Sequence, residues 1–316
     1  MQFRATTFGG WRPALAAAIT IAGCSNSDSG TTTGAGGAAA STTSASTSSS
    51  SSSGTSATTG TGASTGSGGA TCGAPVEKPH DPSKAEWSYH GAGESPADWG
   101  TLMGDGVCGM GMSQTPIDIV DSATVVGTKA LAFANYDKAI PFDLLDNGHA
   151  LQINYAGTMS AVDPQIAYDG KTYYLAQFHW HSASEHAMNG GAQLFEVHFV
   201  HKAADGALAV VGVLFKSGAE NATLADLMKR DPGHEKEVSC ADTVTPASLL
   251  PASRGFYHYS GSLTTPPCSE GLNWFVMTDT LEASAQQQTT YQAGFLGTTN
   301  RPLQPLDGRI VEKHAP

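Results

Sequence analysis

The 316-residue sequence lacks the features that would place it in several common classes of protein. It has no CxxC pair, which argues against a cysteine zinc site or a dithiol redox motif. Lys and Arg number only 16 against 28 Asp and Glu, and the formal net charge of −12 argues against nucleic acid as a partner. No internal repeat and no HExxH helix are present. These absences argue against repeat architectures and against helix-borne zinc proteases.

No hydrophobic run is long enough to span a membrane, but the first 23 residues are predicted to be a lipoprotein-type signal peptide. Arg4 and Arg12 precede a short apolar run, Ala14 to Gly23, and the letters IAGC close this run at Cys24. This ending resembles a bacterial lipobox and implies cleavage before a lipidated Cys24. Because Ser25 is not the aspartate that retains such proteins at the inner membrane, an exported, outer-membrane-anchored lipoprotein is expected, facing the periplasm or the surface. The alternative is ordinary signal-peptidase cleavage, which leaves Cys24 as a free thiol.

Residues 24–72 contain no aromatic residue that could seed a core. From Ser25 to about Thr71 the chain is almost entirely Ser, Thr, Gly and Ala, a composition typical of a flexible tether. Residues 73–316 carry every histidine and nearly all the charges, and we expect them to form one globular domain. With Cys24 set aside for the lipid, the other four cysteines of the chain, Cys72, Cys108, Cys240 and Cys268, fit the disulfides of an exported protein.

The expected domain is predicted to be mostly β. Short apolar runs rich in Val, Phe and Tyr are separated by Gly, Asn, Asp and Pro turns. They are LQINYAG, TYYLAQFHW, QLFEVHFVH, LAVVGVLF and NWFVMTD. The clearest helical signal is NATLADLMKR, where Asn221 or Thr223 is placed to cap a short helix before the Asp231-Pro232 break.

Two of these runs carry histidines at strand spacing. Side chains alternate between the faces of a strand, so Gln177, His179 and His181 point the same way. Phe178 and Trp180 then face the opposite side and are available to a core.

The run FEVHFVH repeats this pattern, with Glu196, His198 and Val200 on one face. If the two runs are neighbours, three imidazoles meet at one point. Three neutral histidines leave a tetrahedral zinc ion with one open position, which is the arrangement of a catalytic site. The alternative for an HxH pair alone is a set of buried histidines satisfied by hydrogen bonds.

Six motifs lie along the chain from about Trp87 to the region of Ile310. They are SQTPIDI at 113–119, NGHALQINY at 147–155, QFHWHSASEH at 177–186, FEVHFVH at 195–201, YSGSLTTPPCSEGLNW at 259–274 and NRPLQPL at 300–306. By these motifs and their order, the sequence resembles the alpha-class carbonic anhydrases in their secreted bacterial form.

The resemblance implies a central, twisted, mainly antiparallel sheet of about ten strands with a few short helices, and zinc at the floor of a conical cleft. It makes His179, His181 and His198 the zinc ligands. Gln177 and Glu196 match the residues that hold the first and third ligand by hydrogen bonds. Glu185 and Thr264 match the pair that orients a zinc-bound hydroxide for attack on CO2, which yields bicarbonate and a proton.

The remaining implied roles concern the substrate and the proton. Thr265 would position bicarbonate, and His149 falls at the family's proton-shuttle position. The apolar pocket for CO2 would contain Val200, Val210, Leu263 and Trp274. Polar cleft residues that order water would be Tyr89, Asn147 and Gln152. His186 and His201 are expected to be structural, and parity places His201 on the face away from the zinc.

The resemblance also implies a Cys108–Cys268 disulfide, which leaves Cys72 and Cys240 as the remaining pair. Departures from the family pattern are Ala183, Trp180 and Thr299, and the last puts the hydrogen bonding before the Arg-Pro motif in doubt. Two other functions stay open. One is a zinc-free binding module on the cell surface, and the other is a zinc hydrolase whose main task is ester hydrolysis.

Overall fold

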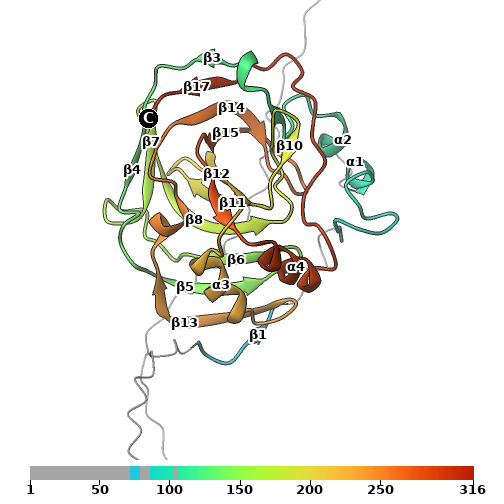
Figure 1. Cartoon of the computed structure of the whole chain (residues 1–316), viewed down its shortest axis with the longest axis vertical. Helices are drawn as coiled ribbons and strands as arrows, with labels where there is room; N and C mark the ends of the chain where they lie inside the picture. Colours follow the sequence, from blue (N-terminus) through green and yellow to red (C-terminus); the bar gives the residue numbers. More distant parts are fainter. Residues whose placement is uncertain (1–71, 79–85, 103–105) are drawn as a thin grey trace, which may run out of the picture. The chain divides into compact units, whose positions relative to one another are not determined.

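A fourteen-stranded β-sheet dominates the computed structural model, which describes residues 72–78, 86–102 and 106–316 (Figure 1). The predicted signal peptide and all but the last residue of the predicted tether lie outside these ranges. The main strand order, from one edge to the other, is β1 (Val76–Glu77), β13 (Lys236–Val244), β5 (Ile140–Asp146), β6 (Leu151–Asn154), β8 (Lys171–His181), β11 (Phe195–Lys202), β12 (Leu208–Ser217), β15 (Glu270–Met277), β14 (Phe256–Ser262), β17 (Glu312–His314) and β3 (Val125–Val126).

Three strands of this sheet lie off the main path. They are β16 (Leu281–Ala283) beside β12, and β4 (Leu131–Ala134) beside β7 (Gln165–Tyr168), which in turn pairs with β8. A separate small sheet contains β10 (Gly191–Ala192), β9 (Ala187–Met188) and β2 (Asp118–Ile119). Strand pairs are mainly antiparallel; the parallel ones are β12 with β15 and β16, β17 with β3, and β2 with β9.

Helices are few and short within the described ranges. They are α1 (Trp99–Leu102), α2 (Val107–Met110), α3 (Ala222–Lys229) and α4 (Ala285–Gly294), with 3₁₀ turns η1 (Asp121–Ala123) and η2 (Pro246–Leu249). Asn221 caps α3 as predicted, since its side chain accepts a hydrogen bond from the amide of Leu224. No helix in these ranges combines the length and apolar character needed to cross a membrane.

The predicted mostly-β, mainly antiparallel fold is confirmed, and each of the five apolar runs contains a strand. The sheet has fourteen strands rather than about ten. The excess comes from two- to four-residue edge strands such as β1 and β3. Such strands are too short to show an alternating hydrophobic pattern, so the sequence does not reveal them.

Apolar side chains bury against both faces of the sheet. Trp274 and Phe275 are consecutive in β15 and belong to different buried clusters, because neighbouring side chains point to opposite faces. The larger cluster includes Phe178, Trp180 and Phe199, the residues predicted to turn away from the histidines. The core therefore fixes which face of β8 and β11 presents imidazoles.

Two disulfides tie the N-terminal part of the described chain to the sheet. Cys72 is bonded to Cys240 in β13, and Cys108 in α2 is bonded to Cys268 beyond the end of β14. These are the pairings expected from the sequence. The second bond holds the loop that contains Thr264 against the N-terminal segment.

Candidate metal centre

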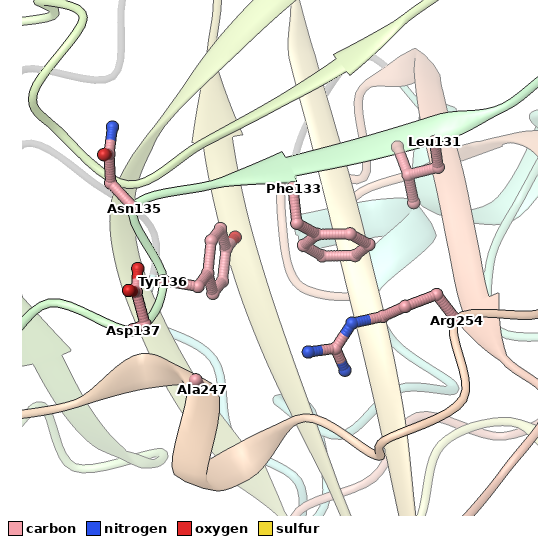
Figure 2. Close-up of a pocket in the computed structure, with 7 residues that line it drawn as sticks. All are labelled: Leu131, Phe133, Asn135, Tyr136, Asp137, Ala247 and Arg254. Atoms are coloured by element: carbon pink, nitrogen blue, oxygen red, sulfur yellow. The ribbon is translucent and has the colours of Figure 1, made fainter.

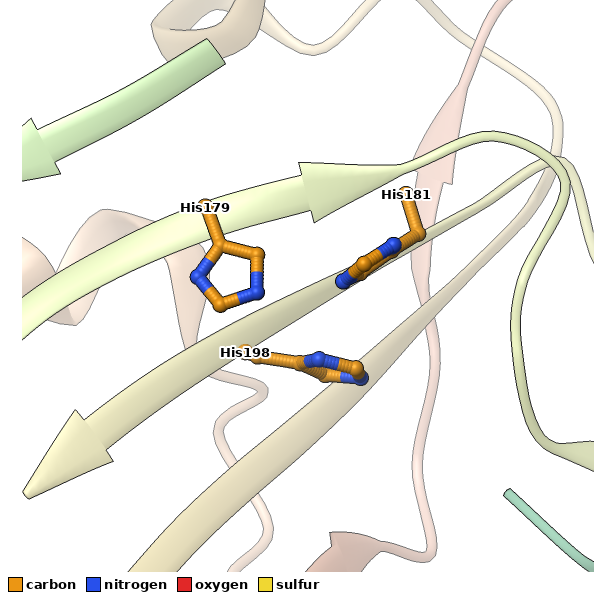
Figure 3. Close-up of side chains that lie close together, drawn as sticks. All are labelled: His179, His181 and His198. Atoms are coloured by element: carbon orange, nitrogen blue, oxygen red, sulfur yellow. The ribbon is translucent and has the colours of Figure 1, made fainter. Parts of the chain in front are cut away.

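Three histidines from the two central strands β8 and β11 point toward one another (Figure 3). The antiparallel register places His198 directly opposite His179, and Glu196 opposite His181. One ligand nitrogen from each of the three rings lies within 4.8 Å of the others. The strand alternation proposed from the sequence therefore brings together the three histidines that it singled out.

In each ring, one nitrogen, here called the inner one, points toward the other two rings, and the other, outer nitrogen points away from them. The outer nitrogen of each ring faces a hydrogen-bond acceptor. His179 Nδ1 lies 2.8 Å from Gln177 Oε1, and His181 Nδ1 donates to the carbonyl oxygen of Thr299 at 2.6 Å. His198 Nε2 lies 3.0 Å from Glu196 Oε1. A ring whose outer nitrogen donates presents a lone pair on its inner nitrogen, so the tautomers suit a metal ligand.

Burial keeps these imidazoles neutral. Desolvation lowers the pKa of His198 and lowers that of His181 to about 4. It also lowers the pKa of His179 well below its ordinary value, and the neighbouring imidazoles add to this effect. The inner nitrogen of His181 is buried without a hydrogen-bond partner in the described structure. An unpaired buried nitrogen is costly, and three convergent neutral donors fit a divalent zinc ion.

Glu196 joins the third histidine to a buried network. Its Oε2 accepts the backbone amides of Glu185 at 3.0 Å and His186 at 2.8 Å. Its Oε1 accepts from Nδ1 of His186 at 2.7 Å, and Nε2 of that ring lies 2.6 Å from the Tyr259 hydroxyl. His186 thus has partners on both nitrogens, which agrees with the structural role expected for it.

Glu185 lies beside the inner nitrogens of two of the rings. Its Oε2 is 3.6 Å from His181 Nε2 and 3.8 Å from His198 Nδ1, while its Oε1 accepts the backbone amide of Arg301 at 2.9 Å. Burial raises the pKa of Glu185 to about 7, and His198, the Arg301 amide and a hydrogen bond from Thr264 act in the opposite direction. The structure therefore places the predicted Glu185 and Thr264 in contact.

The four residues predicted to form an apolar pocket lie together. Val200 pairs with Val210 across β11 and β12, and Val210 pairs with Trp274 across β12 and β15. Leu263 packs against the same cluster. The Trp274 ring centroid is 4.8 Å from that of His198, so an apolar wall stands next to the third histidine.

Aromatic rings connect His149 to the histidine group. The half-buried His149 ring stacks on Trp87 with centroids 3.7 Å apart, and Tyr89 lies 6.5 Å from it. Tyr89 is also 6.4 Å from His181, with its hydroxyl 3.4 Å from Nδ1. His149 is thus separated from the second histidine by one tyrosine ring.

Of the predicted polar cleft residues, Gln152 lies in β6 and Asn147 in the turn before it. Asn147 donates to Gln152 at 3.2 Å, and Gln152 donates to Asn154 at 2.6 Å. Gln152 is paired with His179 in the sheet register, so the polar row runs from the His149 turn to the first histidine. Thr265 is half-buried in the loop after Thr264.

The opposite face of β11 has a different environment. A hollow of about 320 Å³ there is lined by Leu131, Phe133, Asn135, Tyr136, Asp137, Ala247 and Arg254 (Figure 2). The Tyr136 hydroxyl bonds to Nε2 of His201, which is fully buried. His201 therefore faces away from the three convergent histidines, as strand parity predicted.

The roles of two residues near the centre were not predicted from the sequence. The backbone carbonyl of Thr299 holds the His181 ring, and Thr299 Oγ1 accepts a hydrogen bond from the Ser182 amide at 3.0 Å. Because the ring is held by a backbone carbonyl, this contact does not depend on a threonine at position 299. Arg301 is buried and donates to the carbonyls of Thr115 and Cys108, each at 2.8 Å. The sequence did contain a signal for Arg301, because this residue lies in the NRPLQPL motif. The contact of Thr299 is made by its backbone carbonyl, and a backbone contact leaves no signal in the sequence.

Comparisons with known proteins agree with this architecture. A family model described as eukaryotic-type carbonic anhydrase matches residues 94–315. A carbonic anhydrase of Pectobacterium atrosepticum is 38% identical over 230 residues, covering 71% of this chain and 89% of the relative. The alpha-carbonic anhydrase from Thermovibrio ammonificans, solved with the inhibitor sulfanilamide, superposes with a TM-score of 0.66 at 37% identity, over 72% of this chain and 99% of that one. The Photobacterium profundum alpha-carbonic anhydrase gives 0.65 at 38% identity, over 72% and 100%. The chain belongs to the eukaryotic-type, or alpha-class, carbonic anhydrase family and is an enzyme of that family.

Proposed function

We propose that this chain catalyses the reversible hydration of CO2 to bicarbonate and a proton with a zinc ion held by His179, His181 and His198. The observation that carries the proposal is the set of three neutral imidazoles whose outer nitrogens face acceptors and whose inner nitrogens converge. Zinc in such a site supplies hydroxide at neutral pH, because it lowers the pKa of water to about 7; carbonic anhydrase is the established example of this effect.

Glu185 and Thr264 orient the attacking oxygen in this proposal. Thr264 donates its hydroxyl hydrogen to the buried carboxylate of Glu185, and the Thr264 oxygen is then left as an acceptor. An acceptor at this position takes a hydrogen bond from the nucleophile and directs its lone pair toward the substrate. Thr265 is proposed to position bicarbonate.

The apolar wall provides a place for CO2, which has no charge and no hydrogen to donate. Val200, Val210, Leu263 and Trp274 offer it no competing hydrogen-bond groups except the indole N–H. That N–H is engaged, because Trp274 Nε1 donates to the carbonyl oxygen of Ser262 at 2.9 Å. The pocket is thus apolar where it adjoins His198.

The proton is proposed to leave through His149. An imidazole has a reference pKa near 6.5, close to that of the water it must deprotonate, so transfer in both directions is feasible. Tyr89, Asn147 and Gln152 line the intervening region and are proposed to order the waters between the centre and His149.

The protein is proposed to be exported and anchored to the outer membrane by a lipid attached to Cys24. The two disulfides support an oxidising compartment. The lipid anchor rests on the sequence motif alone, since residue 24 lies outside the described ranges.

Replacing His198 tests the metal assignment. The His198→Ala chain retains two ligands, and we expect loss of both bound zinc and CO2 hydration in the purified full-length protein. His234→Ala, which removes an exposed imidazole, is the matched control and should keep both. A His198→Ala protein with full zinc and turnover would contradict the assignment.

The same preparations separate the two alternatives. A wild-type chain that neither retains zinc nor hydrates CO2 would support a binding module. A zinc-loaded chain that hydrolyses an activated ester but does not hydrate CO2 would support a hydrolase.

A further inference from the structure

A second group of metal-ligating side chains lies on the opposite face of the same sheet. Strands β14 and β17 lie side by side (Figure 1). His258 in β14 pairs with Glu312 in β17, and His314 is two residues further along β17 on the same face. One ligand atom from each lies within 4.8 Å of the others. Trp274 contacts His198 while the next residue, Phe275, contacts His258, so the two histidine groups lie on opposite faces of the sheet.

The hydrogen bonds around this second group leave lone pairs pointing inward. His314 Nδ1 lies 2.7 Å from the carbonyl oxygen of Lys129, which can only accept, so that nitrogen carries the hydrogen and Nε2 carries a lone pair. His258 Nε2 lies 3.0 Å from Asn273 Oδ1, which likewise leaves Nδ1 as an acceptor. Both inner nitrogens are 3.2 Å from the same oxygen, Oε2 of Glu312.

Three acceptors in contact require a positive charge between them. The Tyr168 hydroxyl, 3.2 Å from His258 Nδ1, is placed to donate one hydrogen there. The contact between His314 Nε2 and Glu312 still joins a lone pair to a carboxylate, and only a proton or a metal cation makes it favourable. In the described structure the two imidazoles are the only bonded partners of the Glu312 carboxylate, whereas the Glu196 carboxylate also accepts two backbone amides.

The distances and the packing suit an ion. Two ligands about 2.1 Å from a tetrahedral zinc ion lie about 3.4 Å apart, close to the 3.2 Å separations seen here. The His314 ring is fixed by Phe256, which stacks on it with centroids 4.3 Å apart, and by Gly127, where a Cβ atom would lie 2.1 Å from Nε2. Position 127 thus leaves room for the imidazole that a larger residue would displace.

We propose that His258, Glu312 and His314 form a second binding site for a divalent transition-metal ion, of which Zn²⁺ is the best match. Two imidazoles and one carboxylate favour zinc and its neighbours over calcium or magnesium, which take all-oxygen sites. The ion would replace the Tyr168 hydrogen bond at His258 Nδ1 and join the C-terminal strand β17 to β14. The Glu312 side chain is 39% exposed, so a water molecule can complete the coordination. This site does not depend on the proposed catalytic zinc.

Zinc stoichiometry tests the proposal. The purified full-length chain is stripped with a chelator and dialysed at neutral pH against increasing Zn²⁺, and the metal per chain is measured by elemental analysis. We expect two equivalents in the wild type and one in His198→Ala, which keeps only the second site. A wild type that saturates at one equivalent while His198→Ala binds none would overturn the second site and leave the proposed function intact.

Variants of the second site locate the extra equivalent. Glu312→Gln keeps the side-chain shape, and His314→Phe keeps the stacking on Phe256. Each variant should lower the affinity for the second zinc ion by at least about tenfold. Binding of the first zinc ion and CO2 hydration should be unchanged. His234→Ala is the control for loss of an exposed imidazole. If both Glu312→Gln and His314→Phe still bound a second zinc ion with unchanged affinity, that ion would bind at a different site, and the proposal would be overturned. Retention of the first equivalent shows that each variant is folded.

Cobalt(II) provides an independent probe of the ligands. In a His198→Ala background, Co²⁺ bound at the second site should give visible absorption bands typical of nitrogen and oxygen ligation in a low-coordinate site. Addition of Glu312→Gln should remove or shift these bands. A spectrum that the added substitution leaves unaltered would reject Glu312 as a ligand.

Discussion

At the scale of single residues, the proposed metal centre depends on which nitrogen of each ring carries a hydrogen. Gln177, Thr299 and Glu196 each face the outer nitrogen of one of the three histidines, so three unrelated groups favour the same type of tautomer. Two of these contacts follow from strand parity, because Gln177 and Glu196 share a face with the histidines. The third is a backbone carbonyl 118 residues away in sequence, and no side-chain pattern reports it.

The role of His149 is a prediction at this scale. His149→Ala should lower kcat by about tenfold or more in dilute buffer, because proton transfer out of the centre then relies on water. The value of kcat/KM for CO2 should change little, since hydration itself precedes that transfer. Stopped-flow measurement of CO2 hydration, with and without added imidazole, distinguishes the two parameters, and imidazole should restore kcat.

A neighbouring histidine provides the control. A Cβ atom built on Gly148 would lie 3.0 Å from the exposed His234 ring, so His234 packs on the same turn as His149. His234→Ala should leave kcat unchanged. An unchanged kcat in His149→Ala at low buffer would instead show that the proton leaves by another route.

At the scale of secondary-structure elements, β11 shows how one strand serves two environments. His198 faces the proposed metal centre, while His201 is fully buried beside Tyr136 on the other face, after a register shift between Val200 and His201. Burial lowers the pKa of His201 to about 3. A buried imidazole of this kind is neutral in the folded protein and takes up a proton when the chain unfolds.

This difference predicts an acid-dependent loss of stability. The pKa of His201 is lower in the folded chain than the value of about 6.5 expected in the unfolded chain, so between these values the unfolded state binds the additional proton. Stability conferred by the neutral ring is therefore complete above about pH 6.5 and falls as the pH falls, by up to about 1.4 kcal/mol per pH unit. His201→Gln should remove this contribution to the slope.

Urea unfolding of the zinc-loaded full-length protein at pH 7, 6 and 5 measures the slope, with pH values chosen to straddle the reference pKa of about 6.5. Exposed His234→Gln is the matched control and should retain the wild-type dependence. Equal slopes for His201→Gln and the wild type would show that His201 does not contribute to acid sensitivity.

The elements also show what the sequence can predict. The strands that carry the site were identified because Val, Phe and Tyr alternate with the histidines over eight to eleven residues. Helix α4 was not identified, since AQQQTTYQAG has no apolar stripe. Its signal was local: Ser284 and Gln287 form a capping box, which the sequence contains as Ser followed three residues later by Gln.

At the scale of the whole molecule, the N-terminal part of the described chain is covalently fixed to the sheet. The disulfides span 168 and 160 residues of sequence, and closing such long loops restricts the unfolded chain. Cys108–Cys268 also anchors the loop that bears Thr264, so the position of this loop depends on the disulfide. The Cys108–Cys268 pairing was inferred from family resemblance and the Cys72–Cys240 pair by exclusion, because four cysteines alone allow three pairings.

The attachment of the molecule to a membrane is the last prediction, and it concerns residues beyond the described ranges. If Cys24 carries the lipid, Cys24→Ser removes the sulfur that is acylated, and the protein should move from the membrane fraction to the soluble fraction of the cell envelope. Ser25→Ala is the matched control, because it changes the neighbouring hydroxyl and leaves the thiol, and it should stay in the membrane fraction. Fractionation followed by immunoblotting reads the distribution, and CO2 hydration of the released Cys24→Ser protein should match the wild type, since the folded domain is untouched. A Cys24→Ser protein that remained with the membranes would show that a different segment anchors the chain and that the IAGC run is not a lipobox.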